Sequence, residues 1–251
     1  EALAVSQEIL DVAPQDTDAV LQSAYIYSLQ NKAAEAVPFL KKALKSQPGK
    51  PDLYLYLAGA YIQLEKYKKA IDVLEEGIQK APDRDDLFFN LAVAHEHLGN
   101  RAEMIEALKK TLALNAKNAD ALNYLGYTYA EKGEHLDEAI RLIKKALAIK
   151  PRNGYILDSL AWAYYQKGML RKALSIMKKA VKQVPDDPVM REHYGDIYYK
   201  LSNKNKAKSQ WLKSLALEQK NDALRKRFQD AGFGDPDSLL KDAKQRKKKP
   251  K

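Results

Sequence analysis

Few side chains in this sequence have the chemistry of a catalyst or a metal ligand. The chain contains four histidines and no cysteine, which excludes thiolate catalysis, disulfide bonds and cysteine zinc sites. His95 and His97 are two residues apart, so a helix would point them about 200° apart, and they cannot share a metal ion. His135 and His193 stand alone, and neither a glycine-rich phosphate loop nor a Ser/His/Asp motif is present. We therefore expect no enzymatic activity, no cofactor and no metal.

The elements that must position any functional side chain repeat along the sequence. Pro14, Pro48 and Pro82 are evenly spaced at 34 residues, and Pro151 and Pro185 continue the series after one added residue. The clearest copy of the unit runs from Gly154 to Pro185. A period of this length is typical of a repeat array, in which each unit packs only on its neighbours.

Each unit has the pattern of two amphipathic helices. Leu57, Ala60, Tyr61 and Leu64 show the i, i+3, i+4, i+7 spacing of one helix face. In three units a glycine suits the left-handed residue that ends the first helix, and a proline near the end of most units stops the second helix.

Two positions of the unit keep the same side-chain size in every full repeat, one small and one large. The eighth position is small in every full unit: Ala24, Ala58, Ala92, Gly126, Ala161 and Gly195. The eleventh position carries a ring: Tyr27, Tyr61, His95, Tyr129, Tyr164 and Tyr198. A small residue opposite a large one lets two helices pack closely, so these residues, His95 included, are expected to serve packing.

The small and large positions, the period and the proline together resemble the tetratricopeptide repeat. The resemblance implies an all-α fold, a right-handed superhelix or α-solenoid of antiparallel helix pairs. The predicted divisions are a half repeat over 1–16, full repeats over 17–50, 51–84, 85–118, 119–153, 154–187 and 188–221, a capping helix with a short C-terminal segment over 222–240, and a basic tail over 241–251. Such caps are needed because the open end of a stack would otherwise expose apolar surface.

A few residues depart from the repeat pattern. Pro38 lies inside a second helix and is expected to kink or delay it. One extra residue falls in the loop around Glu134 to Leu136. Ala116 and Gln219 replace the terminal proline, so those two helices are expected to run on.

The resemblance also implies where a partner would bind, namely on the inner face formed by positions 2, 5, 6, 9, 12 and 13 of the first helices. The inner face would show Tyr25 and His97 together with the candidate partner-binding residues Tyr56, Phe89, Asn90, Asn123, Tyr124, Tyr127, Asp158, Ser159, Trp162, Tyr165, His193 and Asp196. Rings give a peptide large contact area at low entropic cost, and amides can hydrogen-bond its backbone. The alternative is that several rings pack between adjacent first helices. Asn90, Asn123 and Asp158 are the strongest candidates, because packing gives a polar residue little reason to lie there.

The resemblance narrows the class of partner. The matching positions lack the Lys/Asn/Asn/Lys/Arg clamp with which tetratricopeptide co-chaperones hold a chaperone's terminal carboxylates, so that partner is disfavoured. Repeats four and five, notably residues 153–162, NGYILDSLAW, are similar to bacterial cell-envelope tetratricopeptide proteins, including outer-membrane lipoprotein adaptors of carboxyl-terminal processing proteases. This implies a protein-binding scaffold in the periplasm or at the outer membrane, with a protein or peptide ligand and a protease or envelope protein as candidate partners. A cytoplasmic location is the alternative.

The charge of the chain suggests a rival function. Of the net charge of +10, residues 222–251 contribute ten Lys or Arg against five Asp. Nucleic-acid or anionic-membrane binding through the basic tail is therefore the alternative function. Nucleic acid is disfavoured, because no aromatic residue lies among the lysines of 247–249 to stack on bases.

The two ends of the sequence suggest two further expectations. The sequence begins at Glu1 inside a helical pattern, so we expect a preceding segment, and membrane contact would come through an N-terminal anchor in that segment or through the basic tail. Self-association is a further possibility, in which the half repeat over 1–16 packs on another copy of the chain.

Overall fold

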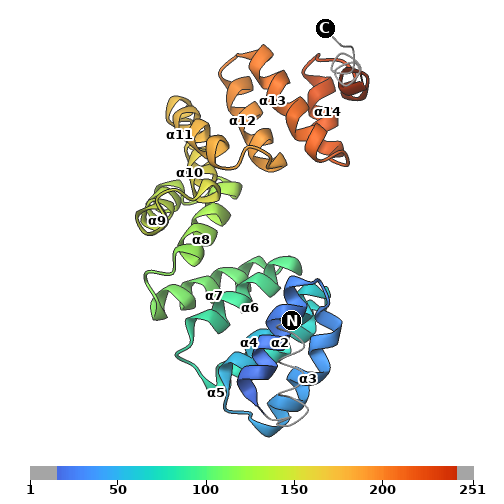
Figure 1. Ribbon diagram of the computed structural model, residues 1–251. Helices are drawn as coiled ribbons and strands as arrows, with labels where there is room; N and C mark the ends of the chain where they lie inside the picture. Colours follow the sequence, from blue (N-terminus) through green and yellow to red (C-terminus); the bar gives the residue numbers. More distant parts are fainter. Residues whose placement is uncertain (1–15, 242–251) are drawn as a thin grey trace. The chain divides into compact units, whose positions relative to one another are not determined.

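The computed structural model describes residues 16–241, and over these residues the chain folds into helices without strands (Figure 1). The helices are α2 (Thr17–Leu29), α3 (Ala33–Ser46), α4 (Pro51–Gln63), α5 (Tyr67–Lys80), α6 (Asp85–His97), α7 (Arg101–Leu114), α8 (Ala119–Lys132), α9 (Leu136–Ile149), α10 (Gly154–Gln166), α11 (Leu170–Gln183), α12 (Pro188–Lys200), α13 (Lys204–Leu217) and α14 (Asp222–Asp230). They follow one another as antiparallel pairs, α2 with α3 through α12 with α13. The predicted all-α tetratricopeptide fold is confirmed.

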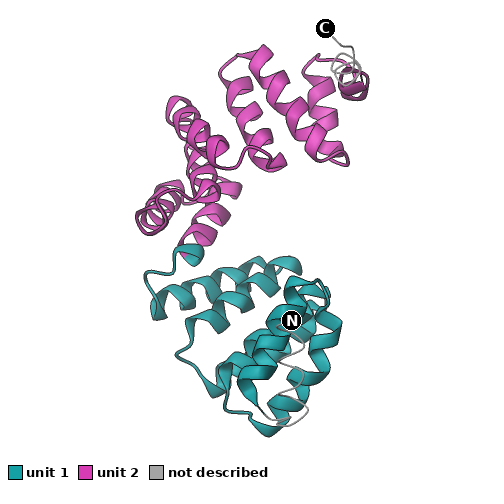
Figure 2. Cartoon of the chain, viewed as in Figure 1, with its two compact units in different colours: residues 1–121 teal, residues 122–251 magenta. Residues whose placement is uncertain are grey.

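The chain divides into two compact units, residues 1–121 and 122–251 (Figure 2). In the first unit, the core is built around Leu40, Leu53, Tyr54 and Leu74, each with 0% exposure. In the second, Trp211, Leu215, Leu224 and Phe228 form a fully buried cluster that joins α13 to α14. Each unit therefore has its own apolar interior.

The turn between the two helices of a pair has one geometry throughout. The fifteenth position of every full repeat has a positive φ, at Asn31, Glu65, Gly99, Gly133, Gly168 and Ser202. Glycine is the residue that adopts this conformation at least cost, yet three repeats do without it. The surrounding helix pair therefore fixes the turn even where the sequence gives no glycine signal.

The small eighth position is needed for close packing of the pair. A Cβ atom added to Gly126 would lie 2.6 Å from Ile143 Cγ1, and one added to Gly195 would lie 2.1 Å from Trp211 Cδ1. Both distances are far below van der Waals contact, so a larger residue would separate the helices. The large partners are therefore residues of the second helix, Ile143 and Trp211, and not the predicted ring at the eleventh position. That ring is buried one turn further along the first helix, where Tyr198 is 6% exposed.

The two predicted longer helices and the predicted delay at Pro38 are wrong. α3 begins at Ala33 and continues through Pro38, so the proline does not delay it. α7 and α13 end at Leu114 and Leu217 and have 14 residues, like α3, α5, α9 and α11, so neither runs on. Side chains replace the missing proline: Asn115 accepts a hydrogen bond from the Lys117 amide at 3.1 Å, and Arg225 donates to the Gln219 carbonyl at 2.7 Å.

The extra residue of the fourth repeat lies in the loop where it was expected. The Glu134 amide closes the end of α8 by bonding to the Tyr129 carbonyl at 2.9 Å, and the His135 carbonyl opens α9 by accepting from the Ala139 amide at 2.9 Å. In other repeats a single residue makes both hydrogen bonds: the Lys66 amide donates to the Tyr61 carbonyl, and the Lys66 carbonyl accepts from the Ala70 amide. In the fourth repeat the added residue is accommodated by His135, which has a left-handed φ of 44°.

Beyond α14, the backbone is again helical from residue 236 to 241. Asp235 starts this segment by accepting hydrogen bonds from the amide and the hydroxyl of Ser238 at 3.0 and 2.6 Å. The predicted half repeat over 1–16, except its last residue, and the basic tail after Lys241 lie outside the described residues. None of the described helices combines the length and apolar composition that spanning a membrane requires.

Candidate partner-binding site

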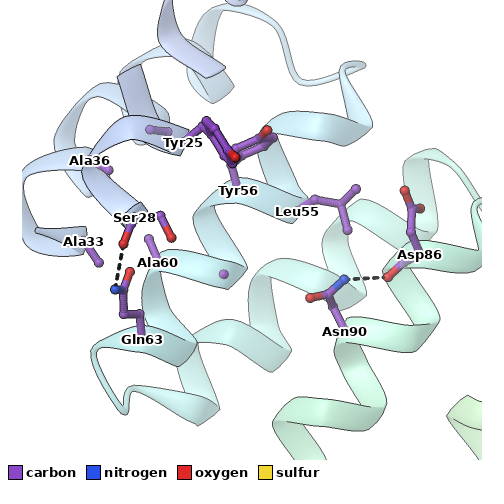
Figure 3. Close-up of a pocket in the computed structure, with 12 residues that line it drawn as sticks. Tyr25, Ser28, Ala33, Ala36, Leu55, Tyr56, Ala60, Gln63, Asp86 and Asn90 are labelled. Carbon is purple, nitrogen blue, oxygen red and sulfur yellow. Dashed lines mark hydrogen bonds between the residues drawn. The ribbon is translucent and has the colours of Figure 1, made fainter. Parts of the chain in front are cut away.

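The first unit contains an open pocket of about 350 Å³ between three first helices and α3 (Figure 3). Tyr25 and Ser28 of α2, Tyr56 and Gln63 of α4 and Asn90 of α6 form its polar and aromatic edges. Its other lining residues are mostly small or apolar: Ala24, Ala33, Ala36, Leu55, Gly59, Ala60 and Asp86. The α2, α4 and α6 residues named here, apart from Ala24 and Ala60, occupy repeat positions that the tetratricopeptide resemblance assigns to the inner face.

Hydrogen bonds hold the amide groups of this pocket in place. Gln63 Nε2 donates to the Ser28 carbonyl at 3.1 Å and to Asn31 Oδ1 at 2.9 Å, and so ties α4 to the end of α2 (Figure 3). Asn90 Nδ2 donates to the Asp86 carbonyl one turn earlier in α6 at 2.9 Å (Figure 3). The pocket edge is therefore preorganised, while the ring of Tyr25 is 53% exposed.

The acidic edge of the pocket is neutralised by Arg84. Its guanidinium donates to Asp86 Oδ2 at 2.6 Å and to Asp52 Oδ1 at 2.8 Å, and hydrogen bonds to first Asp86 and then Asp52 raise the pKa of Arg84. The Leu87 amide also donates to Asp86 Oδ1 at 3.0 Å. Because these bonds occupy the carboxylate, the groups of the pocket left for contact are rings and amides more than charges.

Two predicted site residues of the second unit, Asp158 and His193, form a buried pair. His193 Nδ1 of α12 lies 3.0 and 3.1 Å from the two carboxylate oxygens of Asp158 in α10, and the two side chains are in residues only 7% and 8% exposed. Burial opposes protonation of this imidazole, but the charge and hydrogen bond of Asp158 outweigh it, and the pKa of His193 is raised. The charges of Asp196 and Glu192 act in the same direction.

A stack of three rings covers this pair. The Trp162 ring lies between His193, at 4.1 Å between centroids, and Tyr165, at 4.8 Å, with interplanar angles of 17° and 16°. Trp162 and Tyr165 are half-buried, and the indole Nε1 of Trp162 is buried without a hydrogen-bond partner among the described residues. Burial, followed by the charge of Asp196, raises the pKa of Tyr165.

A second buried network continues toward α14. Asp196, 6% exposed, accepts hydrogen bonds from Trp211 Nε1 at 2.9 Å and from Arg227 at 2.7 Å. Arg227 also pairs with Glu192. Burial raises the pKa of Asp196 although Arg227 acts against it. These contacts fasten the capping helix to α12.

The structure therefore divides the predicted residues into three groups. Tyr56 and Asn90 line the pocket, whereas Phe89 is half-buried on α6 and does not. Asp158, Ser159, His193 and Asp196 are buried in the second unit, where Ser159 Oγ donates to the Tyr155 carbonyl at 3.1 Å. The remaining five candidates are half-buried: Asn123, Tyr124, Tyr127, Trp162 and Tyr165.

Sequence reasoning missed nine of the twelve residues that line the pocket, and for five of them a signal was present. Ser28, Leu55, Gly59, Gln63 and Asp86 occupy the twelfth, fifth, ninth, thirteenth and second positions of their repeats, all of which belong to the predicted inner face. They were passed over because the selection favoured rings and asparagines. Across the described residues, no cluster of three or more His, Asp or Glu side chains could hold a metal ion.

Comparison with known proteins agrees with this architecture. The family model described as "Cilia and flagella-associated protein 70 C-terminal domain" matches residues 2–229. Comparison with curated protein sequences gives no match.

Three solved structures are similar. The APC/C hetero-tetramer Cut9-Hcn1 has a TM-score of 0.80 at 19% identity over 91% of this chain, which spans 45% of that one. PilW, described as a widely conserved type IV pilus biogenesis factor, has a TM-score of 0.72 at 22% identity, covering 84% of this chain and 97% of its own. YrrB, described as a TPR protein with an unusual peptide-binding site, has a TM-score of 0.56 at 23% identity, covering 74% and 95%. At these identities the likeness shows the fold alone.

Proposed function

The chain belongs to the family of the Cilia and flagella-associated protein 70 C-terminal domain, a tetratricopeptide-repeat family, and on this premise we propose a non-enzymatic scaffold that binds a protein segment in the pocket of the first unit. The observation that carries the proposal is the pocket itself, which lies at inner-face positions and is lined by Tyr25, Tyr56, Gln63 and Asn90. Its volume of about 350 Å³ suits one or two side chains of an extended or helical peptide.

The chemistry of the lining residues supports a peptide ligand. Exposed tyrosine rings give contact area with few rotamers to immobilise. The amide of Asn90 uses one donor on the Asp86 carbonyl, and an amide has a second donor and an acceptor that can pair with a peptide backbone. Small residues such as Gly59 and Ala60 allow that backbone to approach closely.

We predict that Tyr56→Ala and Asn90→Ala each weaken peptide binding by about fivefold or more, because truncation of a central interface residue typically costs more than about 1 kcal/mol. The probe is a peptide enriched from a random displayed library on the wild-type protein, and isothermal titration calorimetry measures its Kd. Phe39→Ala is the matched control, since this ring of α3 is 39% exposed and lies outside the pocket.

Binding that survives both pocket substitutions, or failure of any peptide to enrich, contradicts the proposal. Far-UV circular dichroism checks that each variant remains helical. Asp158 and His193 are unsuitable for this test, because their buried contact links α10 to α12 and its loss would disturb folding together with any binding.

For the partner class and location, we propose an envelope protein or a protease met in the periplasm. This rests on the resemblance of residues 153–162 and neighbouring segments to bacterial envelope tetratricopeptide proteins. Cell fractionation of the full-length protein tests it, and recovery with the cytoplasmic fraction would exclude that location.

A further inference from the structure

Two second helices of the second unit carry positive charge without any acidic residue. The cations are Arg171, Lys172, Lys178, Lys179 and Lys182 of α11 and Lys204, Lys206, Lys208 and Lys213 of α13. The name basic face is used for the exposed stripe of Arg171, Lys178 and Lys182 on α11. By contrast, α5 has three basic and three acidic residues, and α7 and α9 each have three basic and two acidic residues. The remaining second helix, α3, has three basic residues and one acidic residue. The same structural position is thus nearly neutral in three repeats, moderately basic in the first and strongly cationic, without any acidic residue, in the last two.

On α11 the cations follow one side of the helix. Arg171, Lys178 and Lys182 stand at i, i+7 and i+11, which at about 100° per residue places them within about 40° of one another. The buried residues Ala173 and Met177 lie on the opposite side, and all three cations are exposed. At about 1.5 Å per residue, this stripe is about 16 Å long.

No carboxylate of the described part of the chain forms an ion pair with these nine cations. Aromatic rings hold some of them instead: Lys172 Nζ lies 5.7 Å from the Tyr164 ring centroid, and Lys206 Nζ lies 5.5 Å from that of Tyr198. Lys144 of α9, outside this set of nine, also lies near Tyr164, with its Nζ 6.0 Å from the ring centroid. A ring attracts an ammonium but carries no net negative charge, so these cations keep a net positive charge that no direct ion pair among the described residues neutralises.

We propose that the basic face binds an acidic protein segment, rich in Asp or Glu. Nucleic-acid surfaces favour Arg for bidentate phosphate contacts and rings for stacking, whereas eight of these nine cations are Lys and no exposed ring lies on α11 or α13. Binding to a membrane surface combines charge with inserted apolar side chains. On α11 and α13, Leu217 at the end of α13 is the only exposed large apolar residue. These helices therefore offer little apolar surface for insertion into a membrane.

The proposal is independent of the pocket in the first unit, and its test uses a defined probe. Fluorescein-labelled poly-L-glutamate is titrated with the 251-residue chain in 50 mM salt, and anisotropy gives the Kd. Lys178→Glu/Lys182→Glu is expected to weaken binding about tenfold, because each substitution removes an attraction and adds a repulsion. Raising the salt to 200 mM should weaken wild-type binding as well.

The repeat supplies a matched control variant. Lys41 and Lys45 of α3 occupy the same two repeat positions as Lys178 and Lys182, and all four are exposed. Lys41→Glu/Lys45→Glu therefore changes the net charge equally, and we expect it to weaken binding less than about twofold. Equal losses in the two variants would show attraction to net charge alone and overturn the proposal.

Two further arms test other anionic partners under the same conditions. One is a 20-base-pair DNA duplex, and the other is vesicles containing phosphatidylserine. If the protein binds DNA or these vesicles more tightly than poly-L-glutamate, and Lys178→Glu/Lys182→Glu weakens that binding about tenfold, the partner of the basic face is a nucleic acid or a membrane. The proposal of an acidic protein segment would then be wrong. Absence of poly-L-glutamate binding at 50 mM salt would also overturn the proposal.

Discussion

Asp158→Ala should lower the free energy of unfolding of the second unit by about 3–5 kcal/mol, since removing one member of a buried ion pair leaves the other without compensation. His193 is 7% exposed, and its Nδ1 lies between the two oxygens of Asp158. The imidazole would remain stacked on Trp162 at 4.1 Å but would lose its acceptor. Hydrogen exchange of the α10 and α12 amides, together with urea unfolding, measures the effect.

The pair also predicts a pH dependence with a definite sign. The pKa of His193 is raised in the folded protein, so its stabilisation is fully present below the unfolded value of about 6.5 and is lost as the pH rises through the folded value. The wild-type protein should therefore be stabilised by this group more at pH 6 than at pH 8.5. In Asp158→Asn, the largest contribution raising this pKa is gone, and the difference should shrink.

Two measurements separate this account from simple loss of packing. Asp158→Asn keeps the volume of the side chain, so it should cost less than Asp158→Ala at pH 8.5 but approach it at pH 6. A variant outside the pair, such as Tyr155→Ala at an exposed residue of α10, should keep the wild-type pH dependence. An unchanged pH dependence in Asp158→Asn would show that His193 is not charged in the folded protein.

The fold could be predicted because each packing contact recurs in every repeat. Six small residues at the eighth position indicate close helix packing from sequence alone. The sequence pattern assigns the ring at the eleventh position as the large partner, whereas in the structure the residue against Gly195 is Trp211 of the second helix, α13. The turn is specified less directly: Glu65 and Ser202 are left-handed without any glycine signal, because the helix pair on both sides determines the conformation.

The site could be predicted only as far as the face on which each residue lies. Asp158 and His193 are at the fifth and sixth positions of successive repeats, and periodicity places both on first helices. It does not show that their side chains meet across the boundary between repeats, at 3.0 Å. Asp158 therefore looked like a polar residue without a packing role, whereas the structure gives it one. The same limit explains why Ala116 and Gln219 were expected to lengthen their helices: the side chains that stop them lie at other positions.

Trp211→Ala is expected to cost about 3–5 kcal/mol in the second unit, the range for truncation of a buried aromatic residue. The indole is fully buried, its Nε1 donates to Asp196 at 2.9 Å, and its ring lies 5.8 and 6.5 Å from those of Phe233 and Phe228. Its loss would remove the contact that joins α13 to α14 and to the acidic residue of α12. Exchange of the α13 and α14 amides should accelerate first.

Gly195 turns this expectation into a test of mechanism. In the wild-type protein, Gly195→Ala should destabilise, because the new Cβ would lie 2.1 Å from Trp211 Cδ1. In the Trp211→Ala background that clash is absent, and alanine should instead stabilise α12 by about 1 kcal/mol through its higher helix propensity. The double-mutant cycle thus predicts a change of sign, measured by urea unfolding. An equal cost in both backgrounds would mean that the eighth position is small for a reason other than the ring that packs on it.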